Sequence, residues 1–447
     1  MIPRALTIAG SDSGGGAGIQ ADLKTFASLG VHGMSAVTAI TAQNTVGVVK
    51  IHDVPVDVIK AQIRVVMEDI GVDAVKTGML HSEEIVIAVA EELKNVKSPL
   101  VVDPVMIAKS GAILLKPEAV EAVKREIIPI AKVITPNRRE AEYLAETKIR
   151  SLDDVRKVAR KLSELGPEAV IVKGGHMPIE GECIDLLYWN GFFKSFSGPY
   201  IESRTDHGTG CTFSSAIAAE LAKGKGLIEA LEVAKKFIIK SITFGLPVGK
   251  GHGPVNPMAW LENKAKMYDV LEEMDKAIKC LESSPHTPRI VPEVQMNLAM
   301  ALPYATDQSE VAAVPGRIVN LGETVKASSA PRFGASKHVS RAVLALMKID
   351  ASFRSILNIR YSPEALKAAE DLGYSISYYD RAEEPEEIKK IEGATIPWGI
   401  RTAIEKAGRI VDIIYHLGDV GKEPMILVLG TSATNVVEKA LKIAQRL

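Results

Sequence analysis

Short apolar runs alternate with longer helical patterns over residues 1–261, and this alternation constrains the fold more than any other feature of the sequence. Such alternation is typical of a largely parallel sheet with helices on both faces. We therefore predict a doubly wound α/β domain. The predicted strands are residues 5–9, 33–39, 74–77, 100–102, 133–135 and 169–173, followed by a hairpin of 183–189 and 192–196. The helical patterns are residues 56–70, 82–93, 117–128 and 152–165.

Polar and glycine-rich loops follow five of the predicted parallel strands. In open α/β sheets, ligands bind beyond the carboxyl ends of the strands, where such loops converge. Five loops that converge on one edge are stronger evidence for a site than any one motif alone. The sequence therefore predicts a ligand site at this edge, built from residues 10–16, 77–79, 103–106, 135–137 and 173–176.

The segment 206–211 (DHGTGC) runs directly into a predicted helix at 212–222. The first turn of a helix has unpaired N–H groups and attracts anions, and Gly208 and Gly210 would let a phosphate approach the backbone. Cys211 stands at the helix start, where the pKa of a thiol is expected to be lowered and a thiolate becomes available as a base. A phosphate cradle beside a base is what a small-molecule kinase needs. The alternative is a glycine turn followed by a buried cysteine.

The second half of the chain differs in character. Residues 264–283 carry an apolar stripe with helical spacing, and a Ser/Pro-rich break follows at 283–288. We expect the apolar face to pack on one of the two domains. The predicted organisation is a domain at 1–261, a helix and linker at 262–287, and a smaller α/β domain at 288–447. Its predicted strands are 353–360, 375–379, 410–415 and 425–429, and its helices 336–347, 364–372, 398–407 and 434–445.

Composition narrows the class of protein. The net charge is −1 and aromatic residues make up 5% of the chain, with no basic block. Nucleic acid and anionic membranes are therefore not expected as partners. No apolar run reaches 18 residues, and the first apolar run ends at once in a glycine loop, so we expect neither a membrane span nor a signal peptide. Three widely spaced cysteines indicate a reducing compartment, and we expect a cytoplasmic protein.

The loops of the first domain resemble those of hydroxymethylpyrimidine/phosphomethylpyrimidine kinases, a thiamine-pathway branch of the ribokinase superfamily. The resemblance covers essentially residues 1–261. It implies two successive ATP-dependent phosphorylations, of 4-amino-5-hydroxymethyl-2-methylpyrimidine and then of its phosphate. The matching segments are 9–25 (AGSDSGGGAGIQADLKT), 39–44 (AITAQN), 76–80 (KTGML), 103–106 (DPVM), 135–137 (TPN) with Glu140, 172–176 (VKGGH) and 207–212 (HGTGCT).

The resemblance also implies roles for single residues. Gln43 has an amide donor and an acceptor that match the ring nitrogen and exocyclic amine of an aminopyrimidine. Met79 and Val105 would enclose the ring, although on composition alone core packing explains them better. The implied substrate-binding residues are Gly10, Asp22, Gln43, Met79 and Val105, with Asp22 near the substrate hydroxyl. The runner-up substrate is pyridoxal, since vitamin B6 kinases of the same branch share most of these loops.

ATP and Mg²⁺ are the implied cofactors. The implied phosphate-binding residues are Asn137, Glu140, Gly208, Thr209 and Gly210, and the implied metal-binding residues are Asp103 and Glu140. Asn137 and Glu140 have an alternative reading as a helix cap with a first-turn acid. Lys173 would neutralise charge on the transferred phosphate and Cys211 would accept the hydroxyl proton, although many members of the superfamily carry Asp at that position.

The second domain resembles archaeal-type thiamine-phosphate synthases. The resemblance implies coupling of the pyrimidine diphosphate to thiazole phosphate with release of pyrophosphate, Arg332 and His338 being the candidate catalytic residues. Residues 430–435 (GTSATN) form a further candidate phosphate-binding helix start. The alternative is a non-catalytic sensor of thiamine phosphate. We expect the whole chain to be a homo-oligomer.

Overall fold

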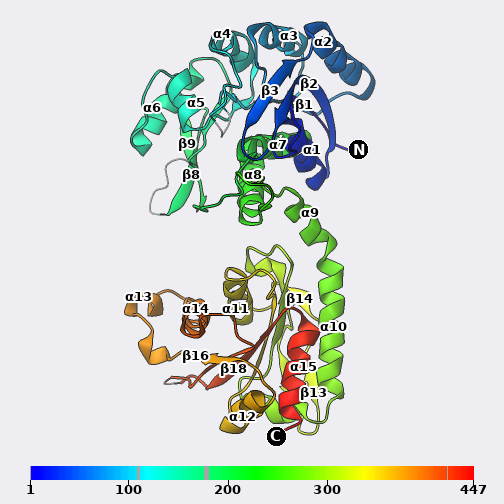
Figure 1. Ribbon diagram of the computed structural model, residues 1–447, viewed down its shortest axis with the longest axis vertical. Coiled ribbons are helices and arrows are strands. Elements are labelled where there is room, and N and C mark those ends of the chain that lie inside the picture. Colours follow the sequence, from blue (N-terminus) through cyan, green and yellow to red (C-terminus); the bar gives the residue numbers. More distant parts are fainter. Residues whose placement is uncertain (1, 108–110, 176–180, 420) are drawn as a thin grey trace. The chain divides into compact units, whose positions relative to one another are not determined.

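The computed structural model describes residues 2–107, 111–175, 181–419 and 421–447. The chain divides into two compact units, Met1–Leu261 and Glu262–Leu447, each with its own hydrophobic core. Among the described residues, no helix has the length and apolar character required to cross a membrane. Each unit is built around one large sheet (Figure 1).

The first unit contains a nine-stranded sheet in the order β3-β2-β1-β4-β5-β6-β7-β8-β9. The six adjacent strands β2, β1, β4, β5, β6 and β7 run parallel, whereas β3, β8 and β9 each pair antiparallel with a neighbour. The predicted largely parallel sheet is confirmed. Its strands are β1 (Arg4–Asp12), β2 (His32–Gln43), β3 (Val48–Asp53), β4 (Ala74–Thr77), β5 (Leu100–Val102), β6 (Val133–Ile134), β7 (Ala169–Val172), β8 (Glu182–Trp189) and β9 (Phe192–Pro199).

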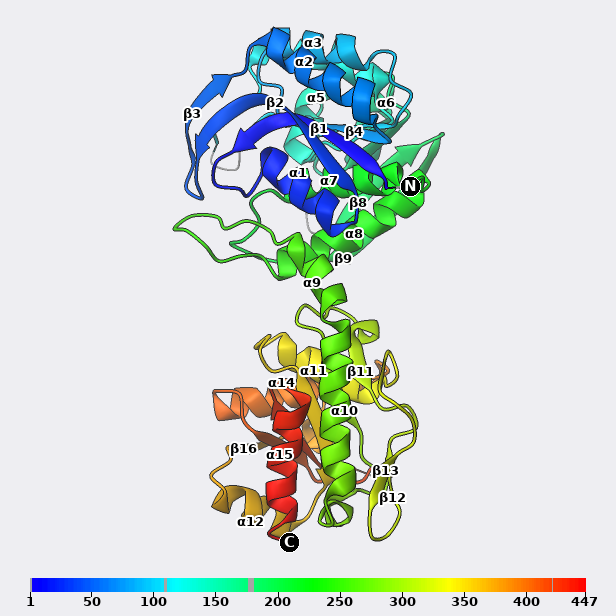
Figure 2. The same ribbon diagram turned by 90° about the vertical axis from the view of Figure 1, so that its right-hand side faces the viewer.

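Helices cover both faces of this sheet because the buried parallel strands are apolar on both sides. Two separate hydrophobic clusters result, one containing α2, α3 and α6 and the other containing α7 and α8. Figure 2 shows α2 and α3 on one side of the strands and α1, α7 and α8 on the other. The helices are α1 (Gly18–Ser28), α2 (Val56–Val65), α3 (Glu83–Leu93), α4 (Pro117–Ala122), α5 (Arg138–Leu144), α6 (Leu152–Ser163), α7 (Thr209–Ala222), α8 (Leu227–Thr243) and α9 (Met258–Ala265).

The predicted β8–β9 hairpin turns at Asn190 and Gly191, which have φ angles of 47° and 81°. Positive φ at both central residues fits the predicted type I′ turn. One strand of this first sheet was not predicted. β3 is an exposed edge strand in which polar and apolar residues mix, so it lacks the continuous apolar run that marks its buried neighbours.

The helix predicted at 264–283 is α10 (Met267–Ser283), and it belongs to the second unit. Its apolar stripe is Val270, Met274, Ala277, Ile278 and Leu281, all of which lie in the core of that unit. The expected linker at 262–287 is therefore largely part of the second unit. The reason is that α10 supplies one side of the core, which residues 288–447 alone leave uncovered.

The second unit has a seven-stranded sheet in the order β14-β11-β10-β15-β18-β17-β16, in which only β16 and β17 pair in parallel. α10 packs beside α15, and α11 packs beside α14 on the other face (Figures 1 and 2). The strands are β10 (Leu298–Ala301), β11 (Val311–Ala313), β14 (Arg332–Phe333), β15 (Ser355–Arg360), β16 (Ile376–Tyr378), β17 (Ile413–His416) and β18 (Met425–Gly430), with β12 (Ile318–Asn320) and β13 (Val325–Ala327) as a separate hairpin. The remaining helices are α11 (His338–Met347), α12 (Pro363–Asp371), α13 (Glu386–Lys389), α14 (Thr395–Ala407) and α15 (Ala433–Ala444).

Candidate functional site

A cleft of about 1520 Å³ lies along the carboxyl ends of the parallel strands of the first unit. Its walls come from the loops that the sequence singled out, although His176 lies outside the described residues. All but one of the residues predicted for the kinase site line this cleft. They are Gly10, Gln43, Met79, Asp103, Val105, Asn137, Glu140, Lys173, Gly208, Thr209, Gly210 and Cys211.

The helix α7 begins at the cleft, and Gly208 is its N-cap residue with a left-handed φ of 80°. A side chain at this position would overlap the carbonyl oxygen of Gly16, so both the conformation and the packing require glycine. A Cβ at Gly210 would lie 3.3 Å from both Asp103 Oδ2 and Lys173 Nζ. The unpaired N–H groups of α7 thus open beside a lysine, an arrangement that suits a phosphate.

Asp103, Lys173 and Glu140 form a charged group next to this helix start. Lys173 Nζ donates to Asp103 Oδ1 at 2.8 Å, and Asp103 is 2% exposed. Burial alone would lower the pKa of Lys173, but the charges of Asp103 and Glu140 raise it above the ordinary value. Burial, together with the charge of Asp103, raises the pKa of Glu140 to about 7 against the opposing effect of Lys173. Two carboxylates therefore lie close to a single cation, the ammonium group of Lys173.

Such a pair suits a magnesium ion, which is normally held by one or two carboxylates, several waters and the substrate's phosphates. Among the described residues there is no cluster of three or more His, Cys, Asp or Glu side chains arranged for a metal. The donor set at Asp103 and Glu140 therefore fits a magnesium ion carried largely by a nucleotide, not one held by the protein alone.

Asn137 and Glu140 also make the helix cap that was the alternative reading of these residues. The Asn137 side chain accepts from the Glu140 N–H at 3.1 Å, and Glu140 Oε2 accepts from the Asn137 N–H at 2.8 Å. This reciprocal capping box fixes the start of α5. It leaves Glu140 Oε1 as the oxygen not engaged in the cap.

The expectation that the pKa of Cys211 is lowered was wrong. Burial raises the pKa of the thiol to about 11, and the charges of Asp22 and Asp103 add to this effect, whereas Lys76 opposes it. A helix start lowers the pKa of a thiol, but this effect is outweighed because two carboxylates and the protein interior both disfavour a thiolate. Cys211 is therefore a thiol in the resting site.

Asp22 does not line the cleft, contrary to the expectation that it lies near the substrate hydroxyl. It is fully buried and accepts from Thr7, Ser215 and Lys76 at 2.6, 2.7 and 2.9 Å. Both oxygens of its carboxylate are engaged in these hydrogen bonds, so Asp22 holds Lys76 in place instead of reaching into the cleft.

Lys76 is a residue that the sequence reasoning missed. It is completely buried yet borders the cleft, and its charge acts on Cys211. Burial alone would lower its pKa, but Asp22, Cys211 and Asp103 raise it, so Lys76 carries a positive charge. A lysine directly after the apolar Ala74 and Val75 of β4 was the signal in the sequence that could have identified it.

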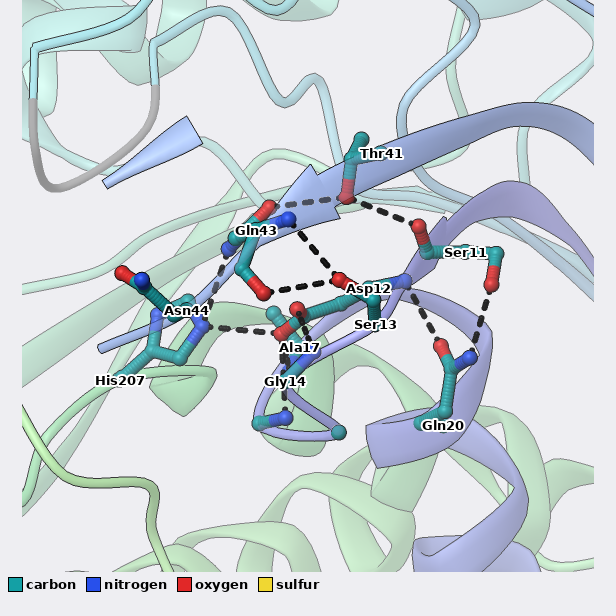
Figure 3. Close-up of polar contacts among 12 residues, drawn as sticks. Ser11, Asp12, Ser13, Gly14, Ala17, Gln20, Thr41, Gln43, Asn44 and His207 are labelled. Atoms are coloured by element: carbon teal, nitrogen blue, oxygen red, sulfur yellow. Dashed lines mark hydrogen bonds and ion pairs between the residues drawn. The ribbon is translucent and has the colours of Figure 1, made fainter. Parts of the chain in front are cut away.

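A second group of missed residues surrounds Gln43 (Figure 3). Asp12 is 3% exposed, and its carboxylate accepts from the N–H groups of Gly14, Gly16 and Ala17 at 2.8, 3.0 and 2.8 Å. Burial raises the pKa of Asp12, but hydrogen bonds from His207 and this backbone outweigh burial and lower it below the ordinary value. The charged Asp12 therefore shapes the glycine loop at the end of β1.

In the second unit, Arg332 lies in the short edge strand β14 and His338 at the start of α11. Both are exposed. Within the described part of the chain neither side chain makes a hydrogen bond or ion pair, so both are available to a ligand.

The start of α15 is not an open phosphate site, contrary to expectation. Glu273 of α10 accepts from the N–H and the hydroxyl of Thr434 at 3.1 and 2.6 Å. Burial raises the pKa of Glu273, but these hydrogen bonds outweigh it and keep the carboxylate ionised. The chain's own anion therefore occupies this helix terminus.

Comparison with known proteins gives separate matches for the two units. Residues 12–256 match the family model described as Phosphomethylpyrimidine kinase, and residues 273–442 match the model described as Thiamine-phosphate synthase ThiN. A hydroxymethylpyrimidine/phosphomethylpyrimidine kinase of Bacillus subtilis (strain 168) is 49% identical over 263 residues, which is 59% of this chain and 97% of the relative. A thiamine biosynthesis bifunctional protein ThiED of Geobacter sulfurreducens is 50% identical over 252 residues, covering 56% of this chain and 51% of the relative.

Two solved structures share the fold of the first unit. An ADP complex of Bacillus subtilis pyridoxal kinase has a TM-score of 0.54 and 38% identity, covering 58% of this chain and 98% of that one. A Staphylococcus aureus pyridoxal kinase in complex with AMP-PCP and pyridoxal has a TM-score of 0.54 and 37% identity, covering 57% and 94%. The predicted ribokinase-like fold is thereby confirmed.

Proposed function

Because the chain belongs to the phosphomethylpyrimidine kinase family, we propose that the cleft of its first unit phosphorylates hydroxymethylpyrimidine and then its phosphate with ATP. The chain is a kinase of thiamine biosynthesis that also carries a thiamine-phosphate synthase domain. The observation that carries the proposal is the start of α7, which opens on the cleft between Lys173 and Cys211. Phosphoryl transfer needs positioning and charge stabilisation above all, and this arrangement supplies both.

Each residue of the cleft has one task in this proposal. The N–H groups of α7 and the Lys173 ammonium stabilise the transferred phosphoryl group. The substrate hydroxyl attacks the γ-phosphorus of ATP, the bond to the β-phosphate oxygen breaks, and ADP leaves. The minor thiolate form of Cys211, which the charge of Lys76 favours against burial, accepts the hydroxyl proton. A bound magnesium ion, held through Asp103 and Glu140, would neutralise charge on the nucleotide's phosphates.

Gln43, Met79 and Val105 are the proposed contacts of the pyrimidine ring. Met79 is 7% exposed and borders Gly10, so the ring would lie against a glycine on one side. The test is a competition between hydroxymethylpyrimidine and pyridoxal for the whole chain, followed by mass spectrometry of the products. We expect the pyrimidine to be preferred, and Gln43→Leu to weaken its phosphorylation more than it weakens ATP binding. Preference of the unaltered chain for pyridoxal contradicts the proposed substrate.

We propose that Arg332 and His338 hold the pyrophosphate that leaves the pyrimidine diphosphate while thiazole phosphate attacks the methylene carbon. The exposure of both side chains supports this role. Arg332→Ala and His338→Ala are each expected to abolish formation of thiamine phosphate in the whole chain while both kinase steps continue. If unaltered chain binds thiamine phosphate but never forms it from the diphosphate and thiazole phosphate, the second unit is a sensor.

We propose further that the chain works as a homo-oligomer in the cytoplasm. All three cysteines are free, as is usual in a reducing compartment. Val46 and Val49, at the β2–β3 edge, are 65% and 83% exposed and offer apolar surface for a second copy. Sedimentation equilibrium is expected to give a mass that is a multiple of 48.1 kDa.

A further inference from the structure

His207 stands between two groups that the proposed reaction needs, the Asp12 loop and the Gln43 amide (Figure 3). Its Nε2 atom lies 3.0 Å from Asp12 Oδ2 and 3.2 Å from Gln43 Nε2. Its ring also packs over Gly16, where a Cβ would come within 2.5 Å of His207 Cδ2. One ring nitrogen therefore faces a carboxylate and an amide at the same time.

A ring nitrogen carries either a proton or a lone pair, so it serves only one kind of partner. Asp12 is ionised, because its backbone N–H partners and His207 lower its pKa, and a carboxylate only accepts hydrogen bonds. The proton therefore sits on His207 Nε2 and points to Asp12. A protonated Nε2 cannot accept from the Gln43 amide N–H, whereas its single N–H can be shared between Asp12 and an amide oxygen.

The other end of the Gln43 amide faces the same conflict. Thr41 Oγ1 lies 3.2 Å from Gln43 Oε1 and 2.9 Å from the carbonyl oxygen of Ser11. The single proton of the Thr41 hydroxyl is donated to the carbonyl oxygen of Ser11, because that oxygen can only accept. Thr41 then offers a lone pair, and its best partner is an amide N–H.

Rotation of the Gln43 amide by 180° resolves both conflicts, and the ends of an amide have the same shape. We propose that His207 and Thr41 are specificity-determining residues that hold the Gln43 oxygen on the His207 side and its N–H group on the Thr41 side. This inference rests on the proposed function, in which Gln43 recognises the pyrimidine. So oriented, the amide accepts from an exocyclic amine on one side and donates to a ring nitrogen on the other.

The orientation selects against a ring with reversed polarity. A 4-oxo analogue of hydroxymethylpyrimidine presents an acceptor where the 4-amino ring presents a donor, and an N–H where that ring presents a lone pair. An amide free to rotate accommodates either ring, whereas a fixed amide leaves two polar groups of the 4-oxo ring unpaired. The fixed orientation of the Gln43 amide therefore acts on the choice of substrate and not on the chemical step.

The test is the ratio of kcat/KM for the 4-amino ring to that for the 4-oxo ring in the whole chain. We expect the unaltered chain to favour the 4-amino ring by at least about a hundredfold. His207→Leu and Thr41→Val each release one end of the amide and are expected to reduce this ratio by about tenfold, with the KM for ATP unchanged. His207→Gln, which keeps a donor toward Asp12, is expected to retain most of the ratio. The matched control is His252→Gln, which alters the neighbouring His252–Asp206 pair (3.1 Å) and is expected to leave the ratio unchanged.

The outcomes separate the two proposals. If the unaltered chain does not favour the 4-amino ring, the proposed substrate is wrong and the inference falls with it. If the unaltered chain favours that ring and His207→Leu and Thr41→Val lower both kcat/KM values equally, only the inference is overturned, since both residues are then merely structural. Thr41→Val decides the matter alone if His207→Leu fails to fold.

Discussion

At the scale of single residues, the kinase site places lysines and carboxylates close together around the start of α7. Lys76 and Lys173 face the carboxylates of Asp22, Asp103 and Glu140, and all of these residues except the partly exposed Lys173 are buried. Burial and neighbouring charges both act on the pKa values of Lys76, Lys173 and Glu140. Protonation in the site is therefore expected to change when a charged nucleotide enters.

The pH profile tests the role of Cys211. Because its pKa is raised to about 11, the thiolate fraction grows roughly tenfold for each pH unit between 7 and 10. If the thiolate is the base, kcat rises with pH over this range. Cys211→Asp provides a carboxylate that is already ionised, so the profile is expected to flatten, whereas Cys211→Ala is expected to lose about 10²–10⁴-fold in kcat. Near-normal turnover of Cys211→Ala would show that another group accepts the proton.

Glu140 links nucleotide binding to proton release. Its pKa is raised to about 7 in the folded chain, so at pH 6 most of the folded molecules hold a proton there. A raised carboxyl pKa also means that stability falls as pH rises from about 4.5 to 7. Magnesium nucleotide favours the ionised form and is expected to expel the proton. Calorimetry at pH 6 in buffers of different ionisation enthalpy measures this release, which Glu140→Gln is expected to abolish.

The buried pair of Lys76 and Asp22 has a structural task as well. Both side chains are 0% exposed, so removing one charge leaves the other buried without its partner. Lys76→Met is expected to destabilise the first unit by about 3–5 kcal/mol. Urea unfolding followed by circular dichroism measures the loss. The double variant Lys76→Met with Asp22→Leu, which leaves no unpaired charge, is expected to recover part of it.

At the scale of elements, apolar runs and glycine turns were sufficient to predict the central strands and most helices. β4 and β5 match their predicted bounds because each is a buried run between clear breaks. β3 and β11–β14 were not predicted, since edge strands and two- or three-residue strands contain too little pattern, and the four-residue interior strand β10 was also missed. The cleft residues were predicted from their loops, whereas Lys76, Asp12 and His207 depend on contacts between distant segments that spacing does not reveal.

The cap of α15 offers a test at this scale. Glu273 reaches the first turn of α15 from a separate helix, so it joins α10 and α15 as well as satisfying the helix terminus. Glu273→Ala is expected to destabilise the second unit by about 1–2 kcal/mol. Its effect on the thermal midpoint is compared with that of Glu272→Ala, which removes an exposed ion pair with Lys276 on the same helix and is expected to change little.

At the scale of the whole molecule, the chain contains two folding units, and the division falls near residue 261 and not after α10. Five buried side chains of α10 belong to the core of the second unit. A fragment 288–447 loses them, at about 1.5–3 kcal/mol for each of the four larger side chains, and is expected to be unfolded, whereas 262–447 is expected to fold. Circular dichroism and cooperative thermal unfolding of the two fragments compare them directly. A folded 288–447 fragment would show that α10 is dispensable.

The central claim is that one chain carries out consecutive steps, in which the second unit consumes what the first unit makes. Phosphorus NMR of the whole chain with hydroxymethylpyrimidine, thiazole phosphate, ATP and Mg²⁺ follows every phosphate in one sample. We expect the pyrimidine monophosphate and diphosphate to appear in turn, followed by thiamine phosphate and pyrophosphate in equal amounts, with Arg332→Ala stopping at the diphosphate. Accumulation of the diphosphate by the unaltered chain, with no thiamine phosphate formed, would contradict the account.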